Sequence, residues 1–276
     1  MTKKFHITAF SKGLYSNWFW HHPSRTLFDI GEGFATYAGN HIFGVERICI
    51  SHAIHGDHIG GLATFLGIRN SSRGDKEKPL DIYYPADDAA IHDYIHFISK
   101  RFGSWLSFKV NWIPTEVGCK FQLDAHHWIE TFKLHHTKKS TTLGYKIVEA
   151  RTRLKKEYVG KHIPTLLKVG VTSKDFSESY TANMLAYCLD AYDLDSNDIA
   201  NAELAIMDCS FLNAKDRDES THFTLDEALN RAWEAKVKHV AIAHISSRYS
   251  PKDIADAVYK LDESRIVVHP NKINEF

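Results

Sequence analysis

The 276-residue chain has no net charge, no long apolar run and no closely spaced cysteines. Its 34 basic and 34 acidic residues cancel, so a polyanion such as nucleic acid could bind only through a local patch. No run approaches the ~18 apolar residues that span a bilayer, and the N-terminal MTKKFHITAF lacks an apolar leader core, so we expect no membrane partner. Four scattered cysteines favour reduced thiols and a cytoplasmic location.

The chain is long enough, and with 43% hydrophobic residues apolar enough, to bury one large core or two small ones. No linker of low complexity divides it. Two blocks made mostly of strands are each followed by helices, which predicts two packed sheets with helices outside. We therefore expect residues 1–276 to form a single domain of the mixed α/β (α+β) class.

Histidine is the one residue type in excess, with 18 copies. The densest group lies in SHAIHGDHIGGL at 51–62, where His52, His55, Asp57 and His58 follow an apolar strand-like run, Arg47–Ile50, and precede a predicted helix. Imidazole and carboxylate groups at a strand-to-helix turn can hold a divalent metal. We prefer this site to a histidine-rich surface loop, because burying four polar groups so close together would otherwise cost desolvation free energy with nothing gained.

Further candidate ligands lie where other predicted strands end. Side chains alternate along Trp128–His136, and His136 shares the apolar face with Leu134, so we expect His136 rather than His135 to face the interior. Three more apolar runs end in groups of the same kind: Asn183–Asp190 in Asp190, Leu204–Ser210 near Asp208, and His239–Ile245 near His244.

Three local expectations concern the elements around these strands. Trp18–Pro23 is predicted to be a turn between two early strands, and Pro85–Arg101 a helix with an acidic first turn. Thr224 and Glu227 form a capping-box pattern, which predicts a helix over Phe223–Val237.

The polar groups at strand ends form a ligand set of nitrogen and oxygen donors without cysteine: His52, His55, Asp57, His58, His136, Asp190 and His244. Such a set suits a two-metal hydrolytic centre better than a closed structural zinc site. A shared carboxylate such as Asp190 would let two cations lie roughly 3.5–4 Å apart. Water held there would ionise near neutral pH and supply a nucleophile.

Seven motifs follow one another along nearly the whole chain: FDIGEG, SHAIHGDHIGGL, PLDIYYP, HHTKKSTTLGY, YCLDA, THFTLDEA and AHISSRY. In this order they resemble the metallo-β-lactamase superfamily, and within it the RNase Z-like branch, which includes phage-type cyclic-nucleotide phosphodiesterases. The resemblance implies a four-layer αββα sandwich, a metal-dependent hydrolase of phosphodiester bonds, and a homodimer.

The resemblance also implies a role for each candidate residue. The ligands divide into two sets that share Asp190: His52, His55 and His136 for one metal, and Asp57, His58 and His244 for the other. Asp57 would also orient the attacking water. His222 would protonate the leaving oxygen, and Asp208 would hold the His222 side chain.

Two features of the predicted centre have alternatives, the role of Arg248 and the identity of the metal. Arg248 is suited equally to a phosphoryl oxygen and to a structural ion pair. The two divalent cations are expected to be zinc, with manganese or iron as alternatives, because imidazole and carboxylate ligands accept all three.

Two local departures from the family pattern bear on this interpretation. Ala53 and Ile54 separate the first two motif histidines where the family has one residue, which would turn His52 away unless the backbone bulges. The Gly/Pro-rich arm that grips tRNA in the family is shortened here to an insertion around 151–183. Within it, Arg151–Lys168 is a basic segment suited either to phosphate or to solvent.

The short arm and the absence of net charge shape the expected substrate. We expect a dinuclear phosphodiesterase that hydrolyses a nucleotide phosphodiester, with a preference for a small cyclic nucleotide. The alternative is an RNase Z-type endonuclease that acts on RNA 3′ ends, as in tRNA 3′ processing. A lactone or thioester hydrolase of the same fold, and a non-catalytic nucleic-acid scaffold, are further alternatives.

Overall fold

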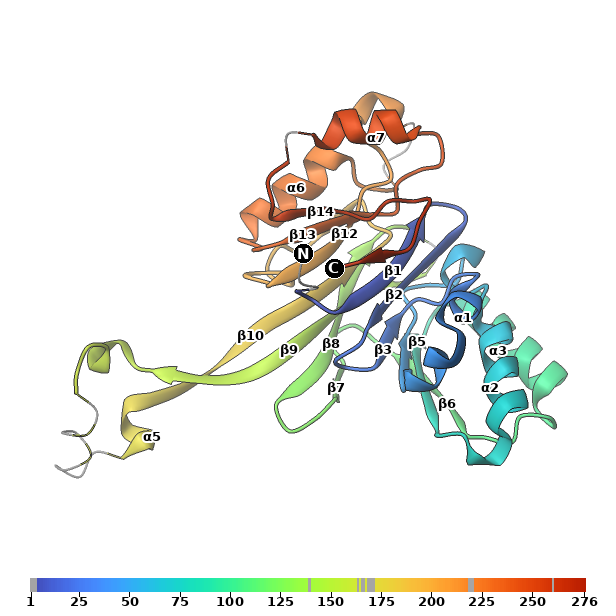
Figure 1. Cartoon of the computed structure of the whole chain (residues 1–276), viewed down its shortest axis with the longest axis horizontal. Coiled ribbons are helices and arrows are strands. Elements are labelled where there is room, and N and C mark those ends of the chain that lie inside the picture. The colour runs from blue at the N-terminus through green and yellow to red at the C-terminus, as the bar shows by residue number, and fades with distance from the viewer. Residues whose placement is uncertain are drawn as a thin grey trace.

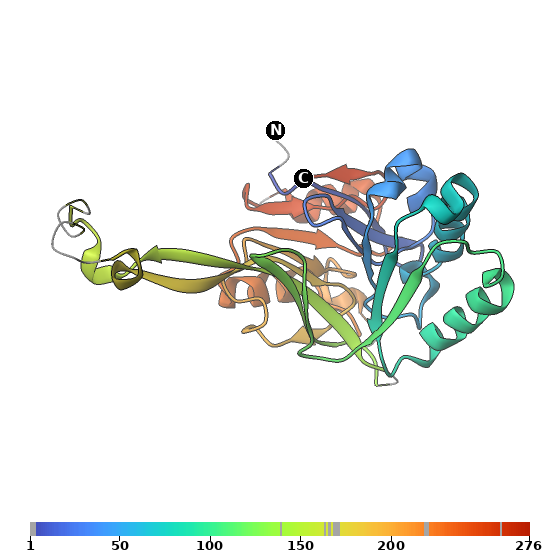
Figure 2. The ribbon, with the colours of Figure 1, turned by 90° about the horizontal axis from the view of Figure 1, so that it is seen from below.

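Two β-sheets pack face to face at the centre of the structure, and helices cover the outer face of each sheet (Figures 1 and 2). The structure, a computed structural model, describes residues 4–138, 140–162, 164, 167, 172–217, 221–259 and 261–276. The arrangement confirms the four-layer αββα sandwich and the mixed α/β class expected from the sequence.

The first sheet contains the N-terminal strands in the order β15-β1-β2-β3-β4-β5-β6. Their bounds are β1 (Ile7–Lys12), β2 (Ser16–His21), β3 (Thr26–Phe28), β4 (Arg47–Cys49), β5 (Leu80–Pro85), β6 (Val110–Thr115) and β15 (Asn274–Glu275). β1, β2 and β3 pair antiparallel, whereas β3 to β6 run parallel. The carboxyl ends of β3 to β6 therefore lie at one edge of the sheet.

The second sheet has the order β11-β8-β9-β10-β12-β13-β14, with β7 paired to β8. Its strands are β7 (Lys120–Gln122), β8 (His127–His135), β9 (Thr142–Leu154), β10 (Ser177–Cys188), β11 (Asp193–Leu194), β12 (Leu204–Asp208), β13 (Val240–Ala243) and β14 (Arg265–Val267). β8, β9 and β10 pair antiparallel, and β10, β12, β13 and β14 run parallel.

Helices pack on the outer face of each sheet (Figure 1). The first sheet carries α1 (Phe34–Ala38), α2 (Leu62–Arg73) and α3 (Ala89–Phe102), and the second carries α6 (Leu225–Glu234) and α7 (Pro251–Val258). Phe65 of α2 packs with Ile48 and Ile82, and Ala228 of α6 packs with Met207. In the described ranges no helix is long and apolar enough to cross a membrane.

Aromatic side chains fill the layer between the sheets. Phe19 and Phe28 of the first sheet contact Tyr187 of the second, with ring centroids 5.5 and 5.1 Å from it. Burying one such side chain contributes about 1.5–3 kcal/mol to folding. This layer therefore fixes the two sheets against each other at the point where their strand ends meet.

Two of the local expectations are corrected by the structure. The turn predicted over Trp18–Pro23 is wrong, because Ser16–His21 forms β2, a strand buried between β1 and β3. The helix predicted from Pro85 begins at Ala89, where the Asp88 carboxylate accepts from the Ala90 amide and caps it. The capping box of Thr224 and Glu227 is confirmed at the start of α6.

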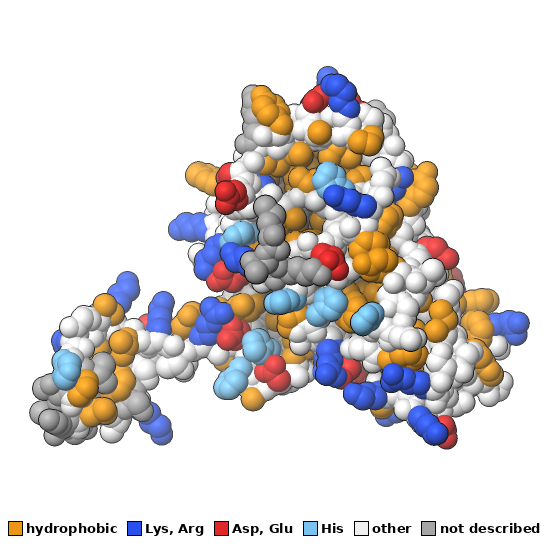
Figure 3. Space-filling model, viewed as in Figure 1, with side chains coloured by type: hydrophobic (Ala, Val, Ile, Leu, Met, Phe, Trp, Pro, Cys, Tyr) orange, Lys and Arg blue, Asp and Glu red, His pale blue; other side chains and the backbone are white. Residues whose placement is uncertain are grey.

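β9 and β10 continue beyond the second sheet as a two-stranded hairpin that projects from the body (Figures 1 and 2). We call the described residues of 151–183 the arm. Its pairing extends outward to Leu154 and Ser177, and the short helix α5 (Ser173–Phe176) lies near its tip. Lys and Arg side chains project from it among hydrophobic ones (Figure 3). Lys168, part of the predicted basic segment, lies outside the described residues.

Candidate metal centre

The predicted ligands converge at the carboxyl ends of parallel strands. Asp208 ends β12, His244 follows β13 directly, and Asp190 lies two residues beyond β10. From the facing sheet, the loop after β4 carries His52 to His58 into the same region. The carboxyl ends of strands are the usual place for ligand sites in α/β sheets.

Asp190 lies in the middle of the group. Its Oδ2 atom is 3.8 Å from Nε2 of His52 and 3.7 Å from Nε2 of His136. Its Oδ1 atom is 3.3 Å from Nε2 of His58 and 3.2 Å from Nε2 of His244. Each carboxylate oxygen therefore faces one pair of imidazoles, which is the arrangement a bridging carboxylate requires.

The potential ligand atoms form three overlapping clusters, each with all of its atoms within 4.8 Å of one another: His52, His55, His136 and Asp190; Asp57, His58 and His244; and Asp190, Asp208, His222 and His244. The first cluster holds the first implied ligand set with Asp190, and the second cluster holds the Asp57, His58 and His244 of the other set without Asp190. His55 is the one exposed member of these clusters, and the others are buried or half-buried.

His52 is fully buried and faces the centre in spite of the additional residue before His55. β4 ends at Cys49, so strand alternation no longer sets the direction of side chains at 52. The loop is held from both sides instead. The Ser51 amide donates to the Asp29 carboxylate at 2.7 Å, and the Ala53 amide donates to the Asp88 carboxylate at 2.7 Å.

His136 also reaches the centre, but not for the reason that alternation gave. Phe132 and Leu134, on the same face of β8, pack toward α6 on the outside of the sandwich. Ile129, on the opposite face, is the residue that packs between the sheets. β8 ends at His135, and the turn beyond it brings His136 into the centre.

Three imidazoles are held through Nδ1, which leaves Nε2 directed at the centre. His58 Nδ1 lies 2.6 Å from an Asp29 oxygen, and His136 Nδ1 lies 2.9 Å from the Thr221 carbonyl oxygen. His244 Nδ1 lies 2.7 Å from the Ser210 hydroxyl. Such outer contacts fix the tautomer and orientation of a metal-binding histidine. Sequence reasoning missed the roles of Asp29 and Ser210, although Asp29 lies in FDIGEG.

The donor atoms present fit two divalent cations. Nε2 of His52, Nε2 of His136 and Oδ1 of Asp190 are buried and have no hydrogen-bond partner among the described residues. An unsatisfied buried polar atom costs about 1–3 kcal/mol, so several in one place indicate a missing ligand. Imidazole nitrogens and carboxylate oxygens without thiolate suit zinc, manganese or iron.

Burial and neighbouring charges set the protonation of these groups. Burial lowers the pKa of His52 and of His136, which keeps their ring lone pairs available at neutral pH. Burial opposes a charge on His58, but the Asp190 and Asp29 carboxylates outweigh it and raise its pKa. Burial would raise the pKa of Asp190, yet His244 and His58 hold it well below its usual range.

The Asp57 carboxylate is held by donors from the first sheet and the loop after β1. Its Oδ2 atom accepts from the Asn17 side-chain amide at 2.8 Å and from the Leu14 backbone amide at 3.2 Å. The same oxygen lies 3.4 Å from His244 Nε2. Gly31 of FDIGEG allows this approach, because a Cβ there would overlap the Asp57 carbonyl oxygen. The glycine is required for packing at this position.

His222 lies at the rim of the centre and is bound to Asp208. Its Nδ1 is 2.6 Å from Asp208 Oδ2, and its ring stacks on that of His244 with centroids 5.1 Å apart. Burial opposes a charge on His222, but the Asp208 carboxylate outweighs burial and raises its pKa to about 9. His222 is therefore protonated at neutral pH and can donate a proton.

Arg217, which sequence reasoning missed, holds the backbone of His222 and is itself held by Glu227. Arg217 donates to the His222 carbonyl oxygen at 2.9 Å and to both carboxylate oxygens of Glu227, at 2.6 and 2.8 Å. Glu227 also accepts from the Thr224 amide as part of the capping box. The start of α6 is thereby linked to the position of His222.

Arg248 is exposed and lies over the Phe211 ring, with 5.0 Å between the guanidinium carbon and the ring centroid. Its guanidinium donates to the Asp216 carbonyl oxygen. Within the described ranges it forms no ion pair, so the structural ion pair considered from the sequence is not found there. A phosphoryl contact for Arg248 stays a prediction.

Known proteins resemble this chain in sequence and in fold. No protein-family model matches the chain. A ribonuclease Z of Listeria innocua is 31% identical over 228 residues, which cover 74% of this chain and 72% of that protein. The tRNase Z TRZ1 of Arabidopsis thaliana is 26% identical over 246 residues, covering 86% and 84%.

Two solved structures share the fold over nearly the full length. The short form of human tRNase Z superposes with a TM-score of 0.65 at 19% identity, covering 97% of this chain and 98% of that one. The metallo-β-lactamase-fold protein YhfI of Bacillus subtilis superposes with a TM-score of 0.63 at 17% identity, covering 99% and 100%. At these identities the likeness shows the fold.

Proposed function

This chain belongs to the ribonuclease Z family, and we propose from that premise that it cleaves RNA at tRNA 3′ ends as a two-metal endonuclease. It is a metal-dependent hydrolase that acts on phosphodiester bonds. The observation that carries the proposal is the position of the Asp190 carboxylate. Each of its two oxygens faces one pair of imidazole Nε2 atoms. The outer contacts of His58, His136 and His244 through Nδ1 direct their Nε2 atoms toward the Asp190 carboxylate.

We assign the first cation to His52, His55 and His136, the second to Asp57, His58 and His244, and Asp190 to both. Two bound cations would polarise the phosphoryl group and activate water. Zinc is the proposed metal, with manganese and iron as alternatives.

The protein's own residues orient the water and move the proton. Asp57 lies beside His58 and His244 and is fixed by the Asn17 amide, so it can accept a hydrogen bond from the attacking water and align it with phosphorus. The proton that the leaving 3′ oxygen needs comes from His222. Asp208 holds the His222 ring at Nδ1 and leaves Nε2 as the donor atom.

The sequence and the relatives favour different substrates. The short arm favours a small cyclic nucleotide. The relatives are ribonuclease Z and tRNase Z enzymes, which favours the tRNA alternative. The arm also projects well beyond the body, as an element that contacts an extended substrate would. We further propose that residues 1–276 act as one hydrolase domain, as a homodimer.

One experiment separates the candidate substrates. The protein is loaded with zinc or manganese and offered a tRNA precursor with a 3′ trailer, a cyclic nucleotide and a lactone panel in parallel. We expect a single cut that releases the trailer, with much slower turnover of the other compounds. Hydrolysis of the cyclic nucleotide while the tRNA precursor stays uncut would restore the preference for a small substrate. Hydrolysis of lactones alone would overturn the proposal that the protein cleaves phosphodiesters.

A further inference from the structure

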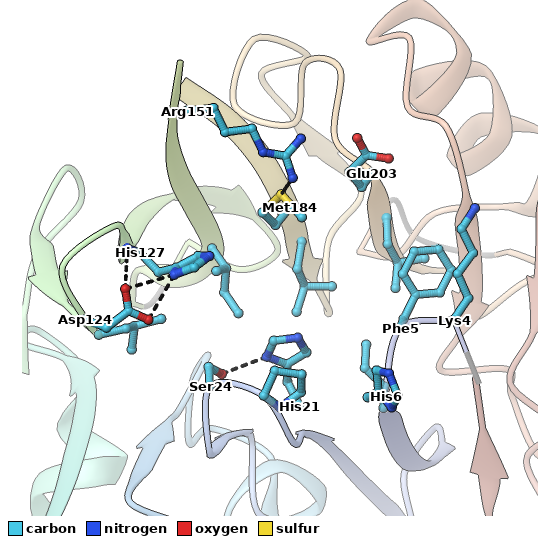
Figure 4. A pocket seen from close by; sticks show the side chains of 16 residues that line it. Lys4, Phe5, His6, His21, Ser24, Asp124, His127, Arg151, Met184 and Glu203 are labelled. Carbon is cyan, nitrogen blue, oxygen red and sulfur yellow. Dashed lines mark hydrogen bonds and ion pairs between the residues drawn. The ribbon is translucent and has the colours of Figure 1, made fainter. Parts of the chain in front are cut away.

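A cavity of about 520 Å³ opens between the two sheets, at the end of the sandwich opposite to the metal centre (Figure 4). Met184 lines it from β10, the strand that leads to Asp190. Leu204 lines it from the start of β12, the strand that ends at Asp208. His21, at one end of β2, also lines it, whereas Asn17 at the other end contacts Asp57. The cavity is therefore separate from the hydrolytic centre.

The walls of the cavity are mostly apolar and come from both sheets. They are formed by Phe5, Ile7, Leu123, Ile147, Met184, Leu185 and Leu204. Its volume lies within the roughly 300–1,000 Å³ of small-molecule sites, which are lined mainly by apolar groups with a few placed polar ones. Water in such a cavity makes few hydrogen bonds, so an apolar molecule that displaces it gains free energy.

The charged side chains around the cavity already have partners. Asp124 binds His127 at 2.9 Å, and Arg151 binds Glu149 at 2.6 Å. Glu203 binds Lys238 at 2.6 Å. Lys4, the remaining charged side chain of the lining, is exposed and lies 3.0 Å from a ring nitrogen of His239, so water screens its charge. The surroundings therefore favour an uncharged ligand.

Besides the charged groups and His127, two histidines and Ser24 supply polar atoms to the cavity walls. His21 is bound to the Ser24 hydroxyl at 2.7 Å, and burial lowers the pKa of His21 to about 4, so the ring is uncharged at neutral pH. His6 lines the cavity with an imidazole that makes no hydrogen bond in the described part of the chain. Its backbone has a φ of 51°, a strained conformation for a residue other than glycine. Such strain is often retained where a side chain must face a ligand.

We propose that this cavity binds an uncharged and mostly apolar molecule, with one hydrogen-bonding group directed at His6. The apolar walls from both sheets would contact its apolar part. The His6 imidazole would bind its polar group. The site is independent of the hydrolytic reaction proposed above.

The test uses N-phenyl-1-naphthylamine, a neutral aromatic probe with one N–H that fluoresces in apolar surroundings. We expect saturable fluorescence with one probe per full-length chain, excited above the tryptophan absorption. Met184→Trp, which fills the cavity, should weaken binding at least about tenfold. His6→Ala should weaken it about two- to tenfold, the effect of one lost neutral hydrogen bond. Tyr259→Trp adds an indole to an exposed position elsewhere and should leave binding unchanged.

Each outcome decides for or against the site. Wild-type binding that both cavity variants weaken supports it. Non-saturable fluorescence, or equal binding by wild type, Met184→Trp and His6→Ala, overturns it. If Met184→Trp does not fold, His6→Ala still decides, because His6 is exposed and its removal leaves the core intact.

Discussion

The metal centre and the arm are the two ends of one pair of strands. Close to the centre, the residues of β9 and β10 are almost all buried, and β10 leads directly to Asp190. Beyond Val148 on β9, and before Leu185 on β10, the same strands are half-buried or exposed and extend into solvent. Within the part of the chain that the structure describes, one end has buried donor atoms without hydrogen-bond partners. The other end has exposed Lys and Arg side chains (Figure 3).

The difference indicates that the two ends have separate functions, catalysis at the buried end and substrate binding on the arm. In the proposed mechanism, groups at the buried end contact the reacting phosphodiester whatever lies on either side of it. Groups on the arm lie far out on the projecting hairpin and can contact only a substrate of large extent (Figure 2). Changes at the centre should therefore affect all substrates, and changes in the arm should affect RNA alone. Bis-p-nitrophenyl phosphate, a small phosphodiester, is therefore the comparison substrate for RNA in each experiment.

Asp190→Asn should have the largest effect, on both substrates equally. Asparagine keeps the size of the side chain but offers one oxygen and no charge to the two imidazole pairs. Loss of several kcal/mol of metal-derived stabilisation lowers kcat/KM at least about 10³-fold, at 1.36 kcal/mol per tenfold. Metal content should fall below two ions per chain. Asp198→Asn is the matched control, because its carboxylate lies 3.6 Å from Lys146, outside the centre. An Asp190→Asn variant with full metal content and rate would refute the bridging role.

Asp208→Asn should lower cleavage of RNA by about 10²-fold, the usual contribution of a positioned acid. The effect on bis-p-nitrophenyl phosphate should be smaller, because p-nitrophenolate leaves without a proton. In the wild type the pKa of His222 is raised to about 9, so its donor form is present below that pH and is lost above it. Without the Asp208 carboxylate, burial and His58 lower the pKa of His222, and Asp190 is left to oppose them, so this pKa falls. The alkaline limb of the pH–rate profile for RNA should therefore move to lower pH.

His222→Ala is the companion to that measurement. It should lose RNA cleavage to a similar extent and show no alkaline limb from the imidazole. Both variants should keep two metals. An unmoved alkaline limb in Asp208→Asn, or an equal loss on both substrates, would show that the pair is structural.

Shortening the arm should separate the two substrates. A two-residue Asn-Gly turn can join Leu154 to Ser177, which are already paired in register. We expect kcat/KM for the tRNA precursor to fall about 10- to 100-fold through KM, corresponding to about 1.4–2.8 kcal/mol of lost binding. The salt dependence of that value should flatten as phosphate contacts disappear. Hydrolysis of bis-p-nitrophenyl phosphate should stay unchanged, and an equal loss on both substrates would contradict a role in RNA binding.

The sequence was sufficient for the fold and for the positions of the ligand groups, because these depend on local patterns. Buried strands end in polar groups at Asp190, Asp208 and His244, and parallel strands bring such ends to one edge. His136 is the instructive exception. Alternation assigned it to the interior through Leu134, but that face of β8 packs toward α6, and the turn after His135 places His136 in the centre.

The residues that hold the ligands could not be predicted, because they act across long separations in the chain. Asp29 binds His58 from 29 positions away, and Asn17 binds Asp57 from 40 positions away. Ser210 binds His244 from 34 positions away. Asp29 lies in the FDIGEG motif, but nothing in the sequence pairs it, Asn17 or Ser210 with the group that it holds. Only the packing of the two sheets brings these partners together.

Arg217 lies neither among the metal ligands nor on the arm, and its substitution should have the smallest effect. It joins the His222 carbonyl to Glu227 through a two-bond contact that a lysine cannot reproduce. Arg217→Lys should lower kcat for RNA about tenfold, the low end for an outer-shell partner, and leave KM and metal content unchanged. Arg231→Lys is the matched control on α6, because Arg231 binds Asp193 and does not contact His222. Since His222 serves the leaving group, bis-p-nitrophenyl phosphate should be hydrolysed at nearly the wild-type rate. A rise in KM with unchanged kcat would instead place Arg217 in RNA binding, on the side of the arm.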